Sequence, residues 1–400
     1  MSIVWLAWLG CSGEPEEAMP TAPEPIVIGV LAPYGSGPGE GIRHGVEQAV
    51  GDLGGTIAGR PVVVEERDTA WSVDQTVRGF GQLAGAEDAV AVIGVAGDGV
   101  FALMEQLESY ETPLLCTGTG ADRLTAMVAE DPSRYRWFFR VMHRSSELAE
   151  VTSAFARDFL HAKHGVSRFG VLVEQAVWTD QIRSSWRQVI DETEGMELVF
   201  DESFGSETRD FQPLLTKLKD SGAEYVLDAS SKVEATHYLK QWAALEGPPI
   251  GAIPTGAGTQ RYYDELGARG LAVSSVSTIP SEANQATERS AAWWNAYQER
   301  WGDPEYTSAY SYDATMLLAA ALEKTGGEGG DGLVQALEAT DHAGVAGRWV
   351  FGADHQGRYG TGYREIPVVQ YFEEGARGYR IVWPESRAAG EMVWPVWWAK

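Results

Sequence analysis

Cysteine is scarce in this sequence, which has only Cys11 and Cys116 among its 400 residues. Two cysteines cannot form the disulfide framework of a small secreted domain, and Cys116 lies in the apolar run PLLCTG, so we expect no disulfide. The seven histidines form no HExxH pattern, and His161 with His164 fits a solvated helix face better than a metal pair. We therefore expect no metal site.

Basic residues are few relative to acidic ones. The chain has 31 Lys and Arg against 57 Asp and Glu, which gives a formal net charge of -26 at pH 7. A protein that binds the phosphate backbone of a nucleic acid needs a basic face, so this balance argues against such a partner. It suits an extracytoplasmic protein.

Long hydrophobic runs are absent after the N-terminus, since none approaches the roughly 18 residues that a membrane-spanning helix needs. The N-terminal stretch MSIVWLAWLGC is apolar up to Cys11, and the acidic, Pro-rich segment SGEPEEAMPTAPEP follows it. This arrangement resembles a bacterial lipoprotein signal in which Cys11 is lipidated. It departs from that signal because no Lys or Arg precedes the run and Trp8 stands where Leu is usual, so a plain signal peptide is the alternative. We predict that residues 1–25 are a signal and disordered tether, and that the protein is periplasmic or on the cell surface, anchored by lipid to a bacterial membrane.

Motifs of enzymes are also missing. The glycine-rich loop 35–41 does not fit G-x-G-x-x-G, because the third position falls on Glu40 or Ile42, and it lacks the Gly-Lys-Ser/Thr of a P-loop. Asp68 ends a predicted strand and could mimic the acid that binds a ribose, but the fingerprint that would support this is absent. No cysteine or serine has a matching base. We expect no catalysis and no cofactor.

What the sequence does contain is a repeated alternation of apolar runs and amphipathic stretches. In the first unit, 26–55, the run IVIGVLAP precedes a glycine-rich turn and apolar residues at helical spacing. A continuous apolar run is typical of a strand buried on both faces, and a helix directly after it gives half of a βαβ unit. Three more such units follow, with strands expected at 61–68, 89–95 and 113–117.

The extended run WFFRVM, 137–142, interrupts this alternation without a glycine turn, and LAVSSVSTIP, from 271, interrupts it again. Between them lies a second series of strands and helices. Because 400 residues exceed one typical core, two domains are expected. The sequence thus predicts an α/β fold of two doubly wound parallel-sheet lobes.

The order of several short motifs resembles the type I periplasmic binding proteins, in the branched-chain amino-acid (Leu/Ile/Val) receptor group of ABC importers. These motifs are IVIGVLAP, GG-x-I-x-GRPV, AVAVIG, PLLCTGTG, FFRV, RFGVLVE, YVLDAS, SAYSYDAT, G-x-W-x-F and VVQYF. The resemblance covers nearly everything after residue 25. It implies three crossings between the lobes, with lobe 1 at 26–141 and 275–345 and lobe 2 at 142–274 and 346–400, the last including the C-terminal tail.

The resemblance also implies a function. A monomeric extracytoplasmic receptor would close its lobes over a small polar ligand, of amino-acid, amide or amine type, and deliver it to ABC permease subunits. The alternative is the ligand-sensing domain of a signalling system, which genetic linkage to a kinase or regulator would indicate. In neither case does the chain perform covalent chemistry.

The turn after the third strand, 96–99, is the first candidate for ligand binding, with Asp98 and Gly99 as the residues concerned. In strand–turn–helix sheets the ligand lies beyond the carboxyl ends of the strands, where backbone N–H groups can hold a carboxylate or carbonyl. The resembled family usually has a hydroxyl residue near Asp98. A carboxylate there should repel an anionic ligand group or pair with a cationic one. A helix N-cap is the alternative role.

The other candidates follow the remaining strands. Small and hydroxyl residues end the fourth strand, an aromatic residue follows RFGVLVE where the family commonly covers its ligand, hydroxyl residues end two later strands, and a tyrosine heads the helix SAYSYDA. Each has a structural alternative as a turn or core residue. The set is Thr117, Gly118, Thr119, Trp178, Ser230, Thr255 and Tyr310. Because PTGAG lacks the acid that many amino-acid receptors place near Thr255, an amide, a urea-like solute, an amine or an aromatic acid remain candidate ligands beside amino acids.

Overall fold

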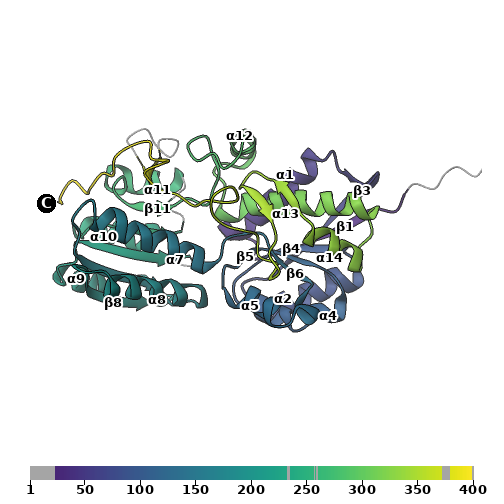
Figure 1. The fold of residues 1–400 in the computed structure, drawn as a ribbon, viewed down its shortest axis with the longest axis horizontal. Helices are drawn as coiled ribbons and strands as arrows, with labels where there is room; N and C mark the ends of the chain where they lie inside the picture. The colour runs from purple at the N-terminus through teal and green to yellow at the C-terminus, as the bar shows by residue number, and fades with distance from the viewer. Residues whose placement is uncertain (1–22, 232–234, 256, 258–259, 372–378, 399–400) are drawn as a thin grey trace, which may run out of the picture.

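The computed structural model describes residues 23–231, 235–255, 257, 260–371 and 379–398 (Figure 1). Most of the predicted signal and tether, including Cys11, lies outside these residues. Figure 1 shows two α/β lobes side by side, each built around its own sheet. Among the described residues, no helix combines the length and apolarity needed to cross a membrane.

The first lobe contains a six-stranded sheet in the order β2-β3-β1-β4-β5-β6. Its strands are β1 (Ile26–Ala32), β2 (Thr56–Ile57), β3 (Arg60–Asp68), β4 (Ala91–Ala96), β5 (Leu114–Gly118) and β6 (Phe138–Arg140). All are parallel except β2, and β1 pairs with β3 on one side and β4 on the other. The apolar run of β1 is buried on both faces because helices cover the sheet on both sides.

The helices of the first lobe come from two parts of the chain. They are α1 (Gly37–Asp52), α2 (Val73–Gly81), α3 (Gly99–Met104), α4 (Leu107–Tyr110), α5 (Arg123–Glu130) and α6 (Pro132–Tyr135), then α12 (Ser290–Trp301), α13 (Tyr306–Thr325) and α14 (Gly330–Glu338), with a π-helical turn at Gln82–Ala86. Ser36 caps α1 by accepting a hydrogen bond from the N–H of Gly39.

The second lobe contains a seven-stranded sheet in the order β15-β14-β11-β10-β9-β7-β8. Its strands are β7 (Arg168–Glu174), β8 (Glu197–Phe204), β9 (Tyr225–Ser230), β10 (Ile250–Pro254), β11 (Ser274–Val276), β14 (Val368–Gln370) and β15 (Arg380–Trp383). Strands β14 and β15 are antiparallel additions to a parallel sheet. The helices are α7 (Ser145–Ala154), α8 (Val177–Glu192), α9 (Gln212–Asp220), α10 (Ala235–Ala244) and α11 (Gln260–Leu266), with a π-helix at Phe155–His161 and a 3-10 helix at Gly267–Gly270.

The buried side chains form one core in the first lobe and two in the second, one on each face of its sheet. The chain crosses between the lobes three times: between β6 and α7, between β11 and α12, and between β13 (Arg348–Val350) and β14. The predicted fold class, two mostly parallel α/β lobes joined by three crossings, is confirmed.

In the observed packing, two of the boundaries between the lobes lie further along the chain than the sequence suggested. The predicted division at 274/275 falls inside β11, which pairs with β10 and β14 in the second sheet. The division at 345/346 precedes a hairpin of β12 (Asp341–Ala343) and β13 (Arg348–Val350). Trp349 of this hairpin is fully buried in the first core, and its indole N–H donates to Asp313 Oδ2 over 2.8 Å. A buried indole with a satisfied N–H holds the hairpin in the first lobe.

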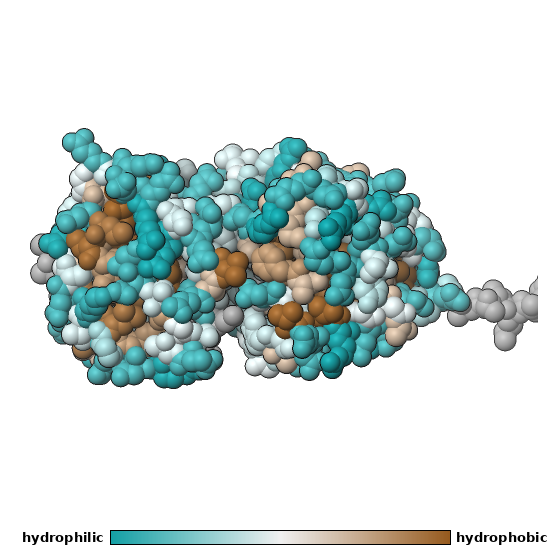
Figure 2. All heavy atoms as spheres, turned by 90° about the horizontal axis from the view of Figure 1, so that it is seen from below, coloured by the Kyte–Doolittle hydropathy of each residue, from teal (hydrophilic) through white to brown (hydrophobic). Residues whose placement is uncertain are grey.

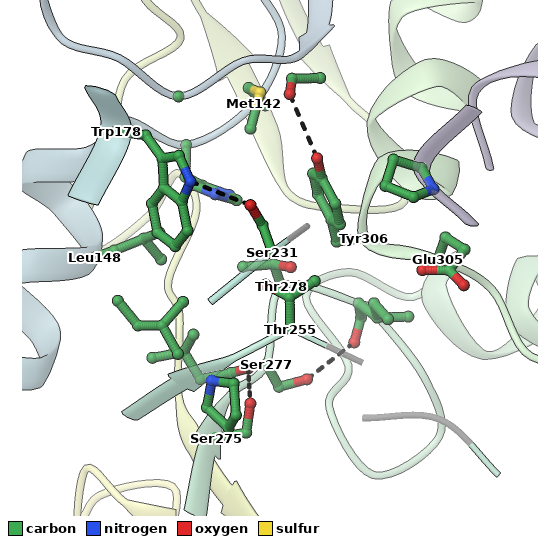
Figure 3. Close-up of a pocket in the computed structure, with 18 of the residues that line it drawn as sticks. Met142, Leu148, Trp178, Ser231, Thr255, Ser275, Ser277, Thr278, Glu305 and Tyr306 are labelled. Atoms are coloured by element: carbon green, nitrogen blue, oxygen red, sulfur yellow. Dashed lines mark hydrogen bonds between the residues drawn. The ribbon is translucent and has the colours of Figure 1, made fainter. Parts of the chain in front are cut away.

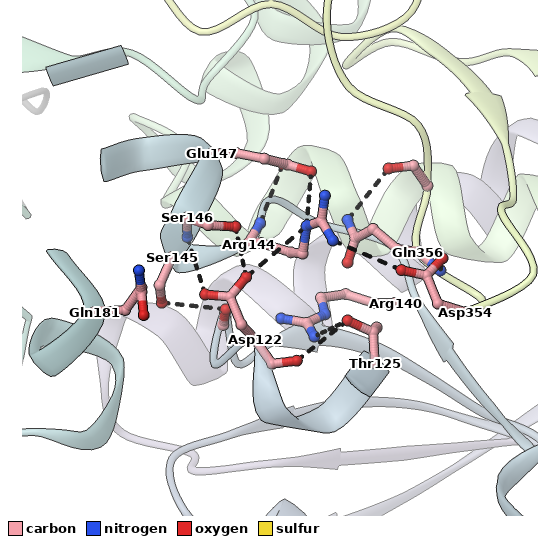
Figure 4. A network of polar contacts seen from close by, with 12 residues as sticks. Asp122, Thr125, Arg140, Arg144, Ser145, Ser146, Glu147, Gln181, Asp354 and Gln356 are labelled. Carbon is pink, nitrogen blue, oxygen red and sulfur yellow. Dashed lines mark hydrogen bonds and ion pairs between the residues drawn. The ribbon is translucent and has the colours of Figure 1, made fainter. Parts of the chain in front are cut away.

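A polar network joins the crossings (Figure 4). Asp122 at the start of α5 accepts hydrogen bonds from the N–H and hydroxyl of Ser146 in α7, at 3.0 and 2.6 Å. Arg364 of the third crossing lies 3.6 Å from Glu147 of α7, and both side chains are 3% exposed. These contacts tie the hinge segments together.

Candidate functional site

A cleft lies between the lobes, where the carboxyl ends of both parallel sheets meet. Figure 2 shows the surface notched between the two halves. About 1490 Å³ of empty space lies between its walls, a volume that includes open solvent. The first lobe contributes the turns after β3, β4 and β5, and the second contributes the ends of β7, β9, β10 and β11. This is the edge at which parallel α/β sheets bind ligands.

Five of the predicted residues line the cleft: Asp98, Gly118, Thr119, Trp178 and Thr255. The turns after β4 and β5 are joined by a hydrogen bond of 3.1 Å from the Thr119 hydroxyl to the Gly97 carbonyl. A Cβ on Gly118 would lie 2.2 Å from the Val95 carbonyl oxygen, so no larger residue fits at that point of the wall. Contact of these residues with a ligand remains a prediction.

The other four predicted residues are buried behind the cleft surface. The Thr117 hydroxyl is 2.8 Å from that of Ser311, the Ser230 hydroxyl is 3.1 Å from that of Tyr238, and the Tyr310 hydroxyl is 3.2 Å from His143 Nδ1. A Cβ on Gly99 would lie 2.5 Å from Thr76 Oγ1, so this glycine allows α2 and α3 to approach. These four residues support the walls of the cleft.

Asp98 occupies the N-cap position of α3, which was its alternative role. Its backbone is helical, with φ -79° and ψ -10°, and its side chain makes no capping hydrogen bond. Effective N-caps have extended backbone angles, which let the side chain reach the N–H groups of the first turn. The Asp98 carboxylate is instead exposed on the cleft surface.

Trp178 lies in the first turn of α8, directly after β7. Its indole N–H donates to the Ser231 hydroxyl over 3.2 Å, which orients the ring on the wall of the cleft. Figure 3 shows Trp178 and Ser231 on one side and Tyr306 and Glu305 of the first lobe on the other. The Tyr306 hydroxyl donates to the Gly118 carbonyl over 3.4 Å. Ring faces from both lobes therefore reach the cavity.

The cleft lining is acidic. Asp98, Asp303 and Glu305 line it, and none of its described residues is Lys or Arg. Burial, with help from Arg364 and Arg140, lowers the pKa of the lining residue His143 to about 3, so this imidazole is neutral at physiological pH. Glu305 also caps α13 in a reciprocal pair with Ser308.

Sequence reasoning missed several lining residues, among them Trp71, Ser277, Thr278, Glu305 and Tyr306. Trp71 had a signal, because it closely follows a strand end at the expected edge of the sheet. Ser277 and Thr278 had none, because they belong to a crossing with no turn motif. Asp68, considered as a ribose-binding acid, instead builds the turn before Trp71: its Oδ1 accepts from the N–H groups of Tyr34 and Ala70.

Two α/β lobes that share one cleft and are linked by three crossings define a two-lobed binding protein. The chain belongs to the periplasmic binding protein family, whose model matches residues 25–375. A similar curated protein is the Leu/Ile/Val-binding protein homolog 3 of Brucella melitensis, 26% identical over 313 residues, which are 75% of this chain and 79% of the relative. The predicted family is thus confirmed.

Solved structures share the fold. A putative branched-chain amino acid ABC transporter protein from Silicibacter pomeroyi has a TM-score of 0.80 at 19% identity, over 94% of this chain and 100% of the other. The substrate-binding protein LivJ of Streptococcus pneumoniae, in complex with isoleucine, has a TM-score of 0.75 at 20% identity, over 90% of this chain and 100% of the other. A solute-binding protein of R. palustris, in complex with benzoate, has a TM-score of 0.72 at 20% identity, over 86% of this chain and 92% of the other.

Proposed function

We propose that this protein is an extracytoplasmic receptor that binds a small solute between its lobes and presents it to an ABC permease. The observation that carries the proposal is the cleft itself, whose walls come from both lobes at the ligand-binding edge of each sheet. Hinge closure around a bound ligand is the usual motion of such proteins. Relatives with the same fold bind isoleucine or benzoate, which supports a small organic solute here.

The location and partners of the receptor follow from the same proposal. Lipidation of Cys11 would hold the protein at a membrane, and the closed form would be the one that a permease recognises. Mass spectrometry of protein extracted from bacterial membranes tests the anchor. A diacylglyceryl group on Cys11 is expected, and cleavage at another residue would replace the anchor with a plain signal peptide.

Ligand-induced stabilisation tests the receptor role. A ligand present at 100 times its Kd stabilises the folded state by about 2.7 kcal/mol, so a thermal-shift screen of amino acids, amides, amines and aromatic acids should raise the Tm for some members. Silence across the whole panel would contradict the proposal.

The role of Trp178 can then be measured with the ligand so found. Trp178→Ala should weaken binding by about 1 to 3 kcal/mol because it removes a ring face of the cleft. Trp178→Phe keeps an aromatic face but cannot donate to Ser231, so its affinity should lie between those of the wild type and Trp178→Ala. Wild-type affinity in both variants, measured by calorimetry, would remove Trp178 from the site.

A further inference from the structure

We propose that the solute is an organic cation, held by the Asp98 carboxylate and the indole face of Trp71. This inference rests on the proposed receptor function and names the chemical class of the ligand. It differs from what the bound relatives suggest, because isoleucine and benzoate both carry a carboxylate.

The first argument is the charge of the cavity wall. Its described lining residues carry three carboxylates and neither Lys nor Arg, and its histidine is neutral. Among the described lining residues, an anionic ligand would find no cationic side chain to replace its hydration, and Asp98 would repel it. A cationic ligand would gain a charge-assisted hydrogen bond at the same place.

The second argument is the placement of Trp71. Ala70 and Trp71 both have left-handed backbones, with φ of 45° and 58°, and Asp68 accepts a hydrogen bond of 2.8 Å from the N–H of Ala70. This turn sets the ring against Gly97, where an added Cβ would lie 3.1 Å from Trp71 Cε3. The indole is therefore held beside the residue that precedes Asp98, and it is 43% exposed. Indole gives the best cation–π surface among side chains.

A buried hydroxyl on the wall of the second lobe marks a further polar position beside this site. Tyr371 lines the cleft and is 1% exposed, and its hydroxyl has no hydrogen-bond partner among the described residues. The phenolic oxygen can accept from an ammonium or guanidinium N–H, and its O–H can equally donate to an oxygen of the ligand, so this hydroxyl favours a polar ligand group without selecting its charge. A buried polar group without a partner is costly, and a polar group on the ligand that reached it would remove that cost.

Probes that share one apolar body and differ in charge test the inference. The first set is phenethylamine, phenylalanine and 3-phenylpropionate, and the second is isopentylamine, leucine and 4-methylpentanoate. Calorimetry on the purified protein should show the amine of at least one set binding about tenfold or more tighter than its zwitterion and its acid, as a charge-assisted hydrogen bond predicts. Asp98→Asn should weaken the amine by about tenfold, and Trp71→Ala by about threefold to tenfold, with Trp71→Phe in between.

Asp88→Asn is the matched control, since Asp88 is exposed and lies just before β4, at the opposite end of that strand from Asp98. It should leave the affinity unchanged, and the unliganded Tm of each variant shows that it is folded. Tighter binding of an acid or amino acid, or an unchanged amine affinity in Asp98→Asn, overturns the cation assignment and leaves the receptor function standing. If neither set binds but another solute raises the Tm, that solute's charge decides the assignment. If nothing binds at all, both proposals fail.

Discussion

Asp228 should make this protein less stable as the pH rises. This β9 residue is 1% exposed; the Tyr238 hydroxyl donates to its Oδ2, and its Oδ1 has no partner among the described residues. Burial raises the pKa of the Asp228 carboxyl to about 7. In the unfolded chain the same group titrates near 4, as ordinary aspartates do. Between these two values the folded protein keeps a proton that the unfolded chain has lost, so the free energy of unfolding falls as the pH rises.

The magnitude follows from the two pKa values. A difference of about three units corresponds to about 4 kcal/mol, of which about 3 kcal/mol is lost between pH 5 and pH 8. Asp228→Asn keeps the shape of the side chain and an acceptor for Tyr238, but it has no charge to bury. A change of 1 kcal/mol shifts the Tm of a domain of 150–250 residues by about 2 to 4 °C. The Tm of the variant relative to wild type should therefore be about 6 to 12 °C higher at pH 8 than at pH 5.

Scanning calorimetry of wild type and variant at both pH values measures how the difference in Tm between them changes with pH. Any loss of stability that the amide causes equally at both pH values cancels in this comparison. Asp220→Asn is the control, because Asp220 is an exposed carboxylate of the same lobe, and it should leave the profile of Tm against pH unchanged. Equal shifts for Asp228→Asn at pH 5 and pH 8 would refute the reasoning, since they would mean that Asp228 titrates normally in the folded protein.

Two further experiments test the walls and the hinge. Thr117→Val should lower the free energy of unfolding by about 1 to 2 kcal/mol, because the Ser311 hydroxyl loses its partner, and should leave ligand affinity within about twofold of wild type; a large affinity loss would mean that Thr117 reaches the ligand. Arg364→Met should lower the free energy of unfolding by less than the about 3 to 5 kcal/mol of a fully broken buried pair, because Arg144 Nε still lies 3.4 Å from the Glu147 carboxylate; Glu147→Leu in the same chain should recover much of that loss in urea denaturation. A double variant no more stable than Arg364→Met would contradict this pairing.

The strand–helix alternation made the fold predictable. Apolar runs such as 26–32 are long and uninterrupted because strands buried on both faces cannot carry polar residues, and this pattern is local. The boundaries between the lobes were harder to predict from the sequence. Trp349 looks like any other aromatic residue in a β-rich tail, and only its buried hydrogen bond to Asp313 places it in the first core.

The candidate site divides in the same way. Asp98, Thr119 and Trp178 were found because they follow strands directly, and strand order alone brings such residues to one edge. Thr117 and Ser230 satisfied the same rule but face partners behind the wall, because alternate residues at a strand end point to opposite sides.

The sequence by itself determined two lobes of parallel sheet and the edge at which a solute would bind, because both follow from periodicity along the chain. Only the tertiary structure decided which side chains face the cleft and what charge they carry together. Trp71 and Asp98 lie on separate turns, and it is the adjacency of β1 to both β3 and β4 that brings those turns to one wall. Neighbouring positions in a sheet arise from pairing between distant segments, which no local pattern encodes.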